Sequence, residues 1–99
     1  NVVYDPKEAV ERANIVYTDV WASMGQESEA QKRKEIFKPY QINKELLSGA
    51  SDDVIVLHCL PAHREEEITE EILEKYAYVI FEQAENRLHA QKAIMASIM

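Results

Sequence analysis

Three short polar segments of this 99-residue chain contain the side chains best suited to bind or activate a small molecule. Between them they supply a carboxylate, a hydroxyl, a thiol and a guanidinium group. A carboxylate attracts an ammonium group, and a guanidinium group can clamp a carbonyl or phosphate oxygen. The segments are DVWASMGQE (19–27), HCLPAHR (58–64) and EQAENR (82–87).

The first segment begins at Asp19, directly after the apolar residues 15–18. Asp19 could simply end a strand and be solvated, or it could pair with a ligand ammonium group in a partly dehydrated cleft. Ser23, Met24 and Gly25 could form an ordinary turn, or they could offer a hydroxyl and backbone N–H groups to a carboxylate. Recognition of both an ammonium and a carboxylate by one loop would suit an α-amino acid.

The second segment contains His58 and Cys59, followed by a turn that Pro61 stiffens. The two residues could be buried structural groups, or the thiol and the turn's backbone carbonyls could face a reacting group. Neighbours along an extended chain point in opposite directions, so His58 is poorly placed to activate Cys59 as a nucleophile. His58, Cys59 and His63 lack the paired spacing of zinc ligands, so no metal site is expected.

The third segment contains Arg87, which we expect in the first turn of the last helix. The N-terminus of a helix favours anions, so an arginine there indicates a role outside the helix. A salt bridge with Glu82 or Glu85 is the alternative. The glutamates at 65–67 are expected to form a solvated helix face.

The elements that must position these segments alternate between helix and strand, which predicts an α/β fold with helices on both faces of a mainly parallel sheet of about four strands. Ligands collect at the carboxyl ends of such strands, so we expect the three segments to converge on one rim. The expected strands are 2–4, 15–18, 54–57 and 78–81, and the expected helices are 6–13, 27–37, 43–47, 69–75 and 85–98.

Composition narrows the class of protein. The net charge of −7, with no basic patch, argues against nucleic acid as a partner. No apolar run is long enough to span a membrane and no secretion signal is evident, so we expect a soluble, cytoplasmic protein. The chain, residues 1–99, reads as one domain, and its single cysteine excludes an internal disulfide.

Three segments, in this order and at this spacing, resemble the C-terminal part of the ornithine carbamoyltransferase family. They are DVWASMGQE, HCLPAHREEEIT and FEQAENRLHAQKAIM. The resemblance implies a truncated ornithine-binding domain, a Rossmann-like three-layer sandwich. It also implies transfer of the carbamoyl group of carbamoyl phosphate to the δ-amine of L-ornithine. The products would be L-citrulline and phosphate, and neither a cofactor nor a metal would take part.

By this resemblance, Asp19 and Ser23 hold the α-amino group of ornithine, and the backbone of Met24 meets its carboxylate. The loop 19–27 is expected to close over ornithine, with Gly25 supplying backbone freedom.

The resemblance assigns the carbamoyl phosphate end of the site to Cys59, Leu60 and Arg87. The backbone carbonyls of Cys59 and Leu60 would face the carbamoyl amide, and the Cys59 thiol would lie near the δ-nitrogen. Arg87 would polarise the carbamoyl oxygen, so Cys59 and Arg87 are the expected catalytic residues.

The chain departs from the family in two respects. Family enzymes are much longer, and their phosphate-binding segments have no counterpart here, so we expect negligible transferase activity from this chain alone. Many members have glycine at the position of Glu65, which indicates a backbone angle there that glutamate resists.

A truncated sheet would expose a strand edge, so a homo-oligomer or self-association through that edge is expected. The alternative function is a folding or self-association module without catalytic activity. A flavodoxin-like phosphate binder is disfavoured because the chain has no glycine-rich phosphate loop.

Overall fold

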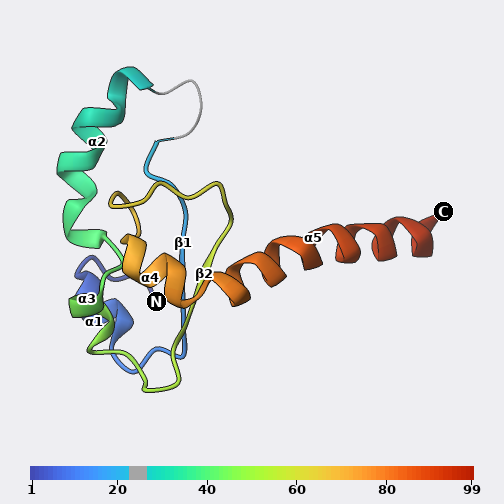
Figure 1. Ribbon diagram of the computed structural model, residues 1–99, viewed down its shortest axis with the longest axis horizontal. Coiled ribbons are helices and arrows are strands. Elements are labelled where there is room, and N and C mark those ends of the chain that lie inside the picture. Colours follow the sequence, from blue (N-terminus) through green and yellow to red (C-terminus); the bar gives the residue numbers. More distant parts are fainter. Residues whose placement is uncertain (23–26) are drawn as a thin grey trace.

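The computed structural model describes residues 1–22 and 27–99, and two parallel strands lie at its centre (Figure 1). Strand β1 (Ile15–Thr18) pairs with β2 (Ile55–His58), with Ile15 opposite Ile55 and Thr18 opposite His58. The prediction of a parallel α/β fold is confirmed, and the expected strands 15–18 and 54–57 are found, the second shifted by one residue.

The hydrophobic core lies on one face of this sheet. Val16 and Val56 point into it and are buried, whereas Ile15 and Tyr17, on the opposite face of β1, are 59% and 54% exposed. Helices α1 (Pro6–Val10), α3 (Lys44–Leu47) and α4 (Glu70–Lys75) all contribute buried side chains. The core consists of Val10, Val16, Ile42, Leu46, Val54, Val56, Ile68, Ile72, Leu73, Tyr76 and Ile80.

Side-chain caps begin these three short helices, near the starts of the expected helices 6–13, 43–47 and 69–75. Oδ1 of Asp5 accepts from the backbone N–H of Lys7 at 3.0 Å, and Oδ1 of Asn43 accepts from that of Leu46 at 2.8 Å. Thr69 caps α4 in the same way. Each cap satisfies a backbone donor that the first turn of a helix leaves free.

Two helical regions, 6–13 and 27–37, differ from the expected helices. Helix α1 stops before residue 13 because Arg12 adopts a positive φ of 59° and donates its backbone N–H to the carbonyl of Gly49. The region 27–37 is a 3₁₀ turn, η1 (Glu27–Glu29), followed by α2 (Ala30–Phe37). A second 3₁₀ turn, η2 (Lys38–Tyr40), contains the proline that ends α2.

The expected strand 78–81 is wrong, because these residues belong to the long helix α5 (Ala77–Ile98). Tyr76 and Ile80, four residues apart, are both buried, while Tyr78 and Phe81 are 71% and 60% exposed. This is helical periodicity, which a short apolar run cannot reveal by itself. The helix-forming residues after position 82 extend the helix back to Ala77.

The expected strand 2–4 is also wrong. Val2 and Tyr4 are each 82% exposed, and the carbonyl of Tyr4 accepts a hydrogen bond from the hydroxyl of Tyr40 rather than from a neighbouring strand. Within residues 1–22 and 27–99 the sheet therefore has two strands, so the three-layer, four-stranded sandwich is not confirmed.

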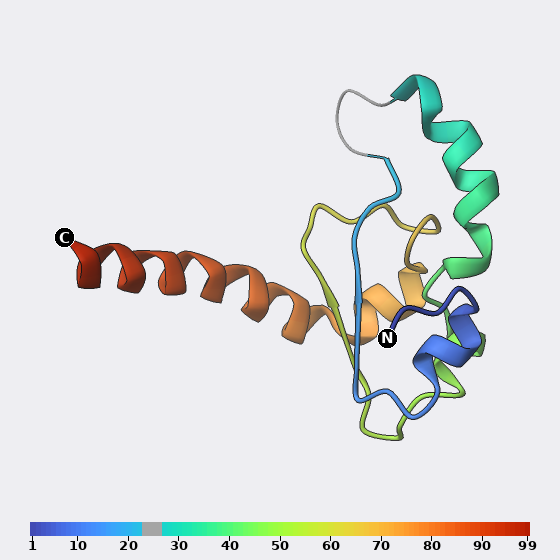
Figure 2. The ribbon, with the colours of Figure 1, turned by 180° about the vertical axis from the view of Figure 1, so that it is seen from behind.

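Helix α5 packs its first turns against β2 and then extends away from the rest of the molecule (Figures 1 and 2). Its outer part carries exposed apolar residues, including Leu88, Ile94, Met95 and Ile98. None of the helices in the described part of the chain is both long and apolar enough to cross a lipid bilayer.

Candidate functional site at the carboxyl ends of the two strands

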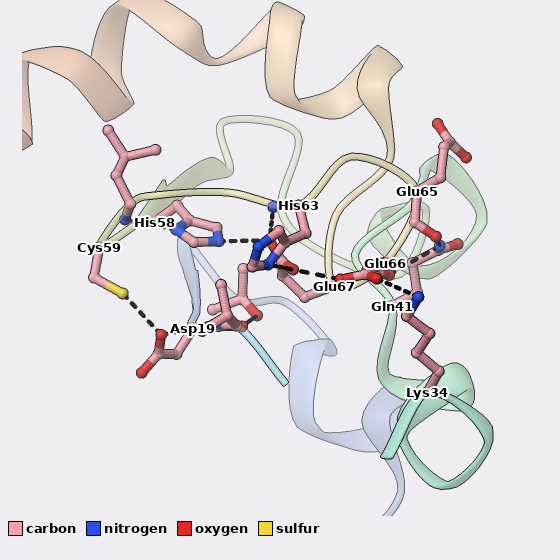
Figure 3. A network of polar contacts seen from close by, with 12 residues as sticks. Asp19, Lys34, Gln41, His58, Cys59, His63, Glu65, Glu66 and Glu67 are labelled. Carbon is pink, nitrogen blue, oxygen red and sulfur yellow. Dashed lines mark hydrogen bonds and ion pairs between the residues drawn. The ribbon is translucent and has the colours of Figure 1, made fainter. Parts of the chain in front are cut away.

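Asp19 and Cys59 meet just beyond the ends of β1 and β2. The strand register places Thr18 opposite His58, so the residues that follow them, Asp19 and Cys59, also lie near each other. The thiol of Cys59 donates a hydrogen bond to Oδ1 of Asp19 at 3.0 Å (Figure 3). Two of the three polar segments thus converge on one rim, as the sequence predicts.

This contact makes Cys59 a neutral donor and Asp19 an ionised acceptor. Burial and the Asp19 carboxylate raise the pKa of the Cys59 thiol. The hydrogen bonds from the Cys59 thiol and from the backbone N–H of Val20 lower the pKa of Asp19. A thiol held in its protonated form is a weak nucleophile, so the geometry suits binding better than covalent catalysis by Cys59.

His58 is fully buried, and both of its ring nitrogens are engaged. The backbone N–H of Leu60 donates to Nδ1 at 2.7 Å, and Nε2 lies 2.8 Å from Oε2 of Glu67. Because Nδ1 accepts a hydrogen bond, the ring proton is assigned to Nε2, and a neutral imidazole donates to Glu67. Neither nitrogen is free to act as a base for Cys59, which agrees with the sequence argument.

Glu67 is the buried partner that the sequence analysis missed, since the run 65–67 was expected to face solvent. Its side chain is fully buried, and Oε2 also accepts from the backbone N–H of His63 at 2.8 Å. One carboxylate therefore joins the turn 63–67 to the end of β2. A histidine after a buried strand needs a partner for its second nitrogen, and that need was the available signal.

Glu65 has a left-handed backbone angle, with φ of 65°, as expected from the family resemblance. Its carboxylate compensates in part, since Oε1 accepts from the backbone N–H of Glu70 at 2.8 Å. The side chain of Gln41 donates to the carbonyls of Glu65 and Glu66, both at 3.0 Å. Local hydrogen bonds thus hold an unfavourable backbone conformation in place.

Arg87 lies in the middle of α5, so the prediction that it stands in the first turn of the last helix is wrong. The last helix was expected to begin near residue 85, whereas α5 begins at Ala77. Glu85 pairs with His89 at 3.2 Å. The positive charge of Arg87 acts on Cys59, where it partly counteracts the rise in the thiol's pKa that burial and Asp19 cause. This charge effect is the smallest of those that act on the Cys59 thiol.

The remaining predicted site residues are Leu60, Ser23 and Met24. Leu60 follows Cys59, is half-buried and has a positive φ of 54°, which turns the chain sharply after β2. Its peptide bond to Pro61 is cis. Ser23 and Met24 lie outside the described residues. The described site therefore consists of Asp19, Cys59 and Leu60, with Arg87 nearby.

A parallel sheet with a carboxylate and a thiol at the carboxyl ends of its strands is typical of α/β domains that bind small molecules there. The family described as "Aspartate/ornithine carbamoyltransferase, Asp/Orn binding domain" matches residues 1–98. The chain belongs to this family.

The relatives of this chain are named as ornithine carbamoyltransferases, a narrower class than the family description. The chain is 57% identical over 98 residues to the ornithine carbamoyltransferase of Thermococcus kodakarensis, covering 99% of this chain and 31% of that protein. It is 63% identical over 94 residues to the anabolic ornithine carbamoyltransferase of Pseudomonas aeruginosa, covering 95% of this chain and 31% of the relative.

Solved structures of ornithine carbamoyltransferases are also similar to this chain. The anabolic ornithine carbamoyltransferase of Campylobacter jejuni superposes with a TM-score of 0.89 at 46% identity, covering 95% of this chain and 31% of that one. The Pyrococcus furiosus enzyme gives 0.85 at 54% identity, covering 95% of this chain and 30% of that one. The chain thus spans about a third of the length of the relatives it matches.

Proposed function

We propose that this chain is the ornithine-binding part of an ornithine carbamoyltransferase, an enzyme of arginine metabolism. The proposed reaction moves the carbamoyl group of carbamoyl phosphate to the δ-amine of L-ornithine, giving L-citrulline and phosphate. The observation that carries the proposal is the 3.0 Å contact of Asp19 with Cys59, near the charge of Arg87. Two distant segments thereby bring together Asp19 and Cys59, and the family resemblance assigns both of them, with Arg87, to one site.

Asp19 would bind the α-ammonium group of ornithine. Its carboxylate is exposed, and its lowered pKa keeps it ionised at neutral pH. Ser23 would share this ammonium group, and the backbone of Met24 would meet the α-carboxylate, as the resemblance implies. A bound ammonium group would compete with the Cys59 thiol for Asp19 and release the thiol toward the ornithine chain.

The δ-amine, in its neutral form, would attack the carbamoyl carbon. The new C–N bond forms, the bond from carbon to the phosphate oxygen breaks, and the δ-nitrogen loses a proton. Negative charge builds on the carbamoyl oxygen in between, and Arg87 would stabilise it. Losing one such donor typically raises a barrier by ~3 kcal/mol. The backbone carbonyls of Cys59 and Leu60 would accept from the carbamoyl amide, and this transfer needs neither a cofactor nor a metal.

A second candidate function is a self-associating module without catalytic activity, and it rests on the exposed apolar surface. Ile15 and Tyr17 leave one face of β1 uncovered, and Ile94 and Ile98 are exposed on α5. Such surfaces promote association, so we propose a homo-oligomer, in the cytoplasm that the sequence analysis predicts. By this proposal the 99-residue chain alone forms no measurable citrulline.

Calorimetric titration of the chain with L-ornithine and with L-norvaline, which lacks the δ-amine, tests the amino-acid site. We expect weak, saturable binding of both, abolished by Asp19→Ala and retained in the control Asp52→Ala, which removes an exposed carboxylate elsewhere. Equal binding by the two variants would contradict the role of Asp19. A separate assay for citrulline distinguishes a binding domain from a complete enzyme.

A further inference from the structure

A second group of ligand-type side chains lies in the turn after the proposed site. His63, Glu66 and Glu67 each present one donor atom, and the three atoms lie within 4.8 Å of one another (Figure 3). Nδ1 of His63 is 3.6 Å from Oε2 of Glu66 and 3.8 Å from Oε1 of Glu67. The proposed carbamoyl transfer uses none of these side chains.

The Oε1 atom of Glu67 is a second, independent observation that points to a bound cation in this turn. The Glu67 side chain is fully buried, and its other oxygen already accepts from His58 and from the backbone of His63. Oε1 itself has no hydrogen-bond partner among the described residues. A buried carboxylate oxygen without a partner is costly, and a cation bound beside it would remove that cost.

We propose that His63, Glu66 and Glu67 bind a divalent transition-metal ion of the zinc class. Ligands about 2.1 Å from a tetrahedral ion are separated by about 3.4 Å. The His63 nitrogen lies 3.6 and 3.8 Å from the two carboxylate oxygens, and all three donor atoms lie within 4.8 Å, so the side chains must draw closer to bind an ion. One imidazole nitrogen with two carboxylate oxygens favours zinc over magnesium or calcium, which prefer oxygen ligands alone. Water would complete the coordination, since His63 is half-exposed.

The surroundings hold these ligands in place and balance their charge. Nζ of Lys34 pairs with Oε1 of Glu66 at 2.7 Å, which leaves Oε2 for the metal. The side chain of Gln41 fixes the backbone carbonyl of Glu66. An ion bound to Glu67 would also immobilise His58, and through it the turn that carries Cys59. The prediction of no metal site rested on the spacing of His58, Cys59 and His63, and the site proposed here combines His63 with two glutamates instead.

Titration of the complete 99-residue chain with Zn²⁺, by calorimetry and by thermal unfolding, tests the site. We expect one ion per chain, with affinity reduced at least about tenfold by His63→Ala and by Glu66→Gln. The matched control is His89→Ala, which removes another half-exposed histidine beside a glutamate, Glu85, and should leave the affinity unchanged. Far-UV circular dichroism establishes that each variant keeps the fold.

The principal rival site is the Cys59 thiol with Asp19. Substituting Co²⁺ distinguishes the two, because a thiolate ligand adds a charge-transfer absorption band that nitrogen and oxygen ligands do not. We expect no such band and no loss of affinity in Cys59→Ser. Unchanged Zn²⁺ affinity in His63→Ala, loss of binding in Cys59→Ser, or equal affinity for Mg²⁺ would each overturn the proposal.

Discussion

Replacing Glu67 by leucine tests the buried hydrogen bonds that join the turn 63–67 to β2. The substitution removes the acceptor for the Nε2 proton of fully buried His58, at a cost of about 1–3 kcal/mol. The backbone N–H of half-exposed His63 also loses its partner but can turn to water. Relief of the buried carboxylate offsets part of the loss. We expect a net fall in the free energy of unfolding of about 2 kcal/mol.

Glutamine at position 67 is the matched comparison. Its amide oxygen can take the place of Oε2 and accept from both His58 and His63, so we expect a loss below about 1 kcal/mol. A surface control, Glu71→Leu on the exposed side of α4, should change stability by less than about 0.5 kcal/mol.

Urea unfolding followed by far-UV circular dichroism, with a chelator present, measures these differences. Nitrogen-15 NMR of His58 supplies a second readout, and we expect the tautomer with its proton on Nε2. Equal stability of Glu67→Leu and the unaltered chain would show that the buried hydrogen bonds of Glu67 do not stabilise the fold. A proton on Nδ1 of His58, or equal losses with leucine and glutamine, would contradict the assigned hydrogen bonds.

Four further predictions concern the neighbouring structure. Asp19→Asn should lower the pKa of Cys59, so alkylation by iodoacetamide should accelerate at a lower pH; an unchanged pH profile would contradict the contact. Because Asp19 has a lowered pKa in the folded chain, the stability that its carboxylate contributes is present at neutral pH and lost in acid. Urea unfolding measured over a series of pH values should therefore show a smaller loss of stability in acid for Asp19→Asn than for the unaltered chain. At position 65, where φ is positive, glycine should be more stable than alanine by about 1 kcal/mol in urea unfolding, and the opposite order would exclude the left-handed conformation. Asn43→Ala should cost about 1 kcal/mol by the same measurement through loss of the α3 cap, whereas a cost near zero would show that the cap contributes nothing.

Local signals predicted the parts of the fold that depend on neighbouring residues. Asn43 and Thr69 begin helices because their side chains accept from the first turn, and four aliphatic residues in a row mark β2. The apolar run 78–81 was misassigned because its length fits a buried strand as well as a buried helical turn. Only the burial of Tyr76 and Ile80, four residues apart, distinguishes the two.

The buried pair of His58 and Glu67 could not be predicted from composition, because three consecutive glutamates ordinarily face solvent. The chain buries one of them by reversing direction at Leu60 and again at Glu65, both with positive φ. The glycine expected at position 65 from the family resemblance was the one sequence signal of the left-handed backbone there. That expectation concerned the backbone angle and did not indicate that the Glu67 carboxylate would be buried.

The two halves of the proposed site depend on different parts of the structure. Asp19 and Cys59 are brought together by the register of two adjacent parallel strands. Arg87 stands on α5, which packs its first turns against β2 and buries Ile80, so we expect the position of Arg87 to depend on that packing. Loosening α5 should therefore remove the arginine charge from Cys59 while the hydrogen bond to Asp19 persists. If the proposed roles hold, binding of the amino acid depends on the strands and activation of the carbamoyl group depends on the helix.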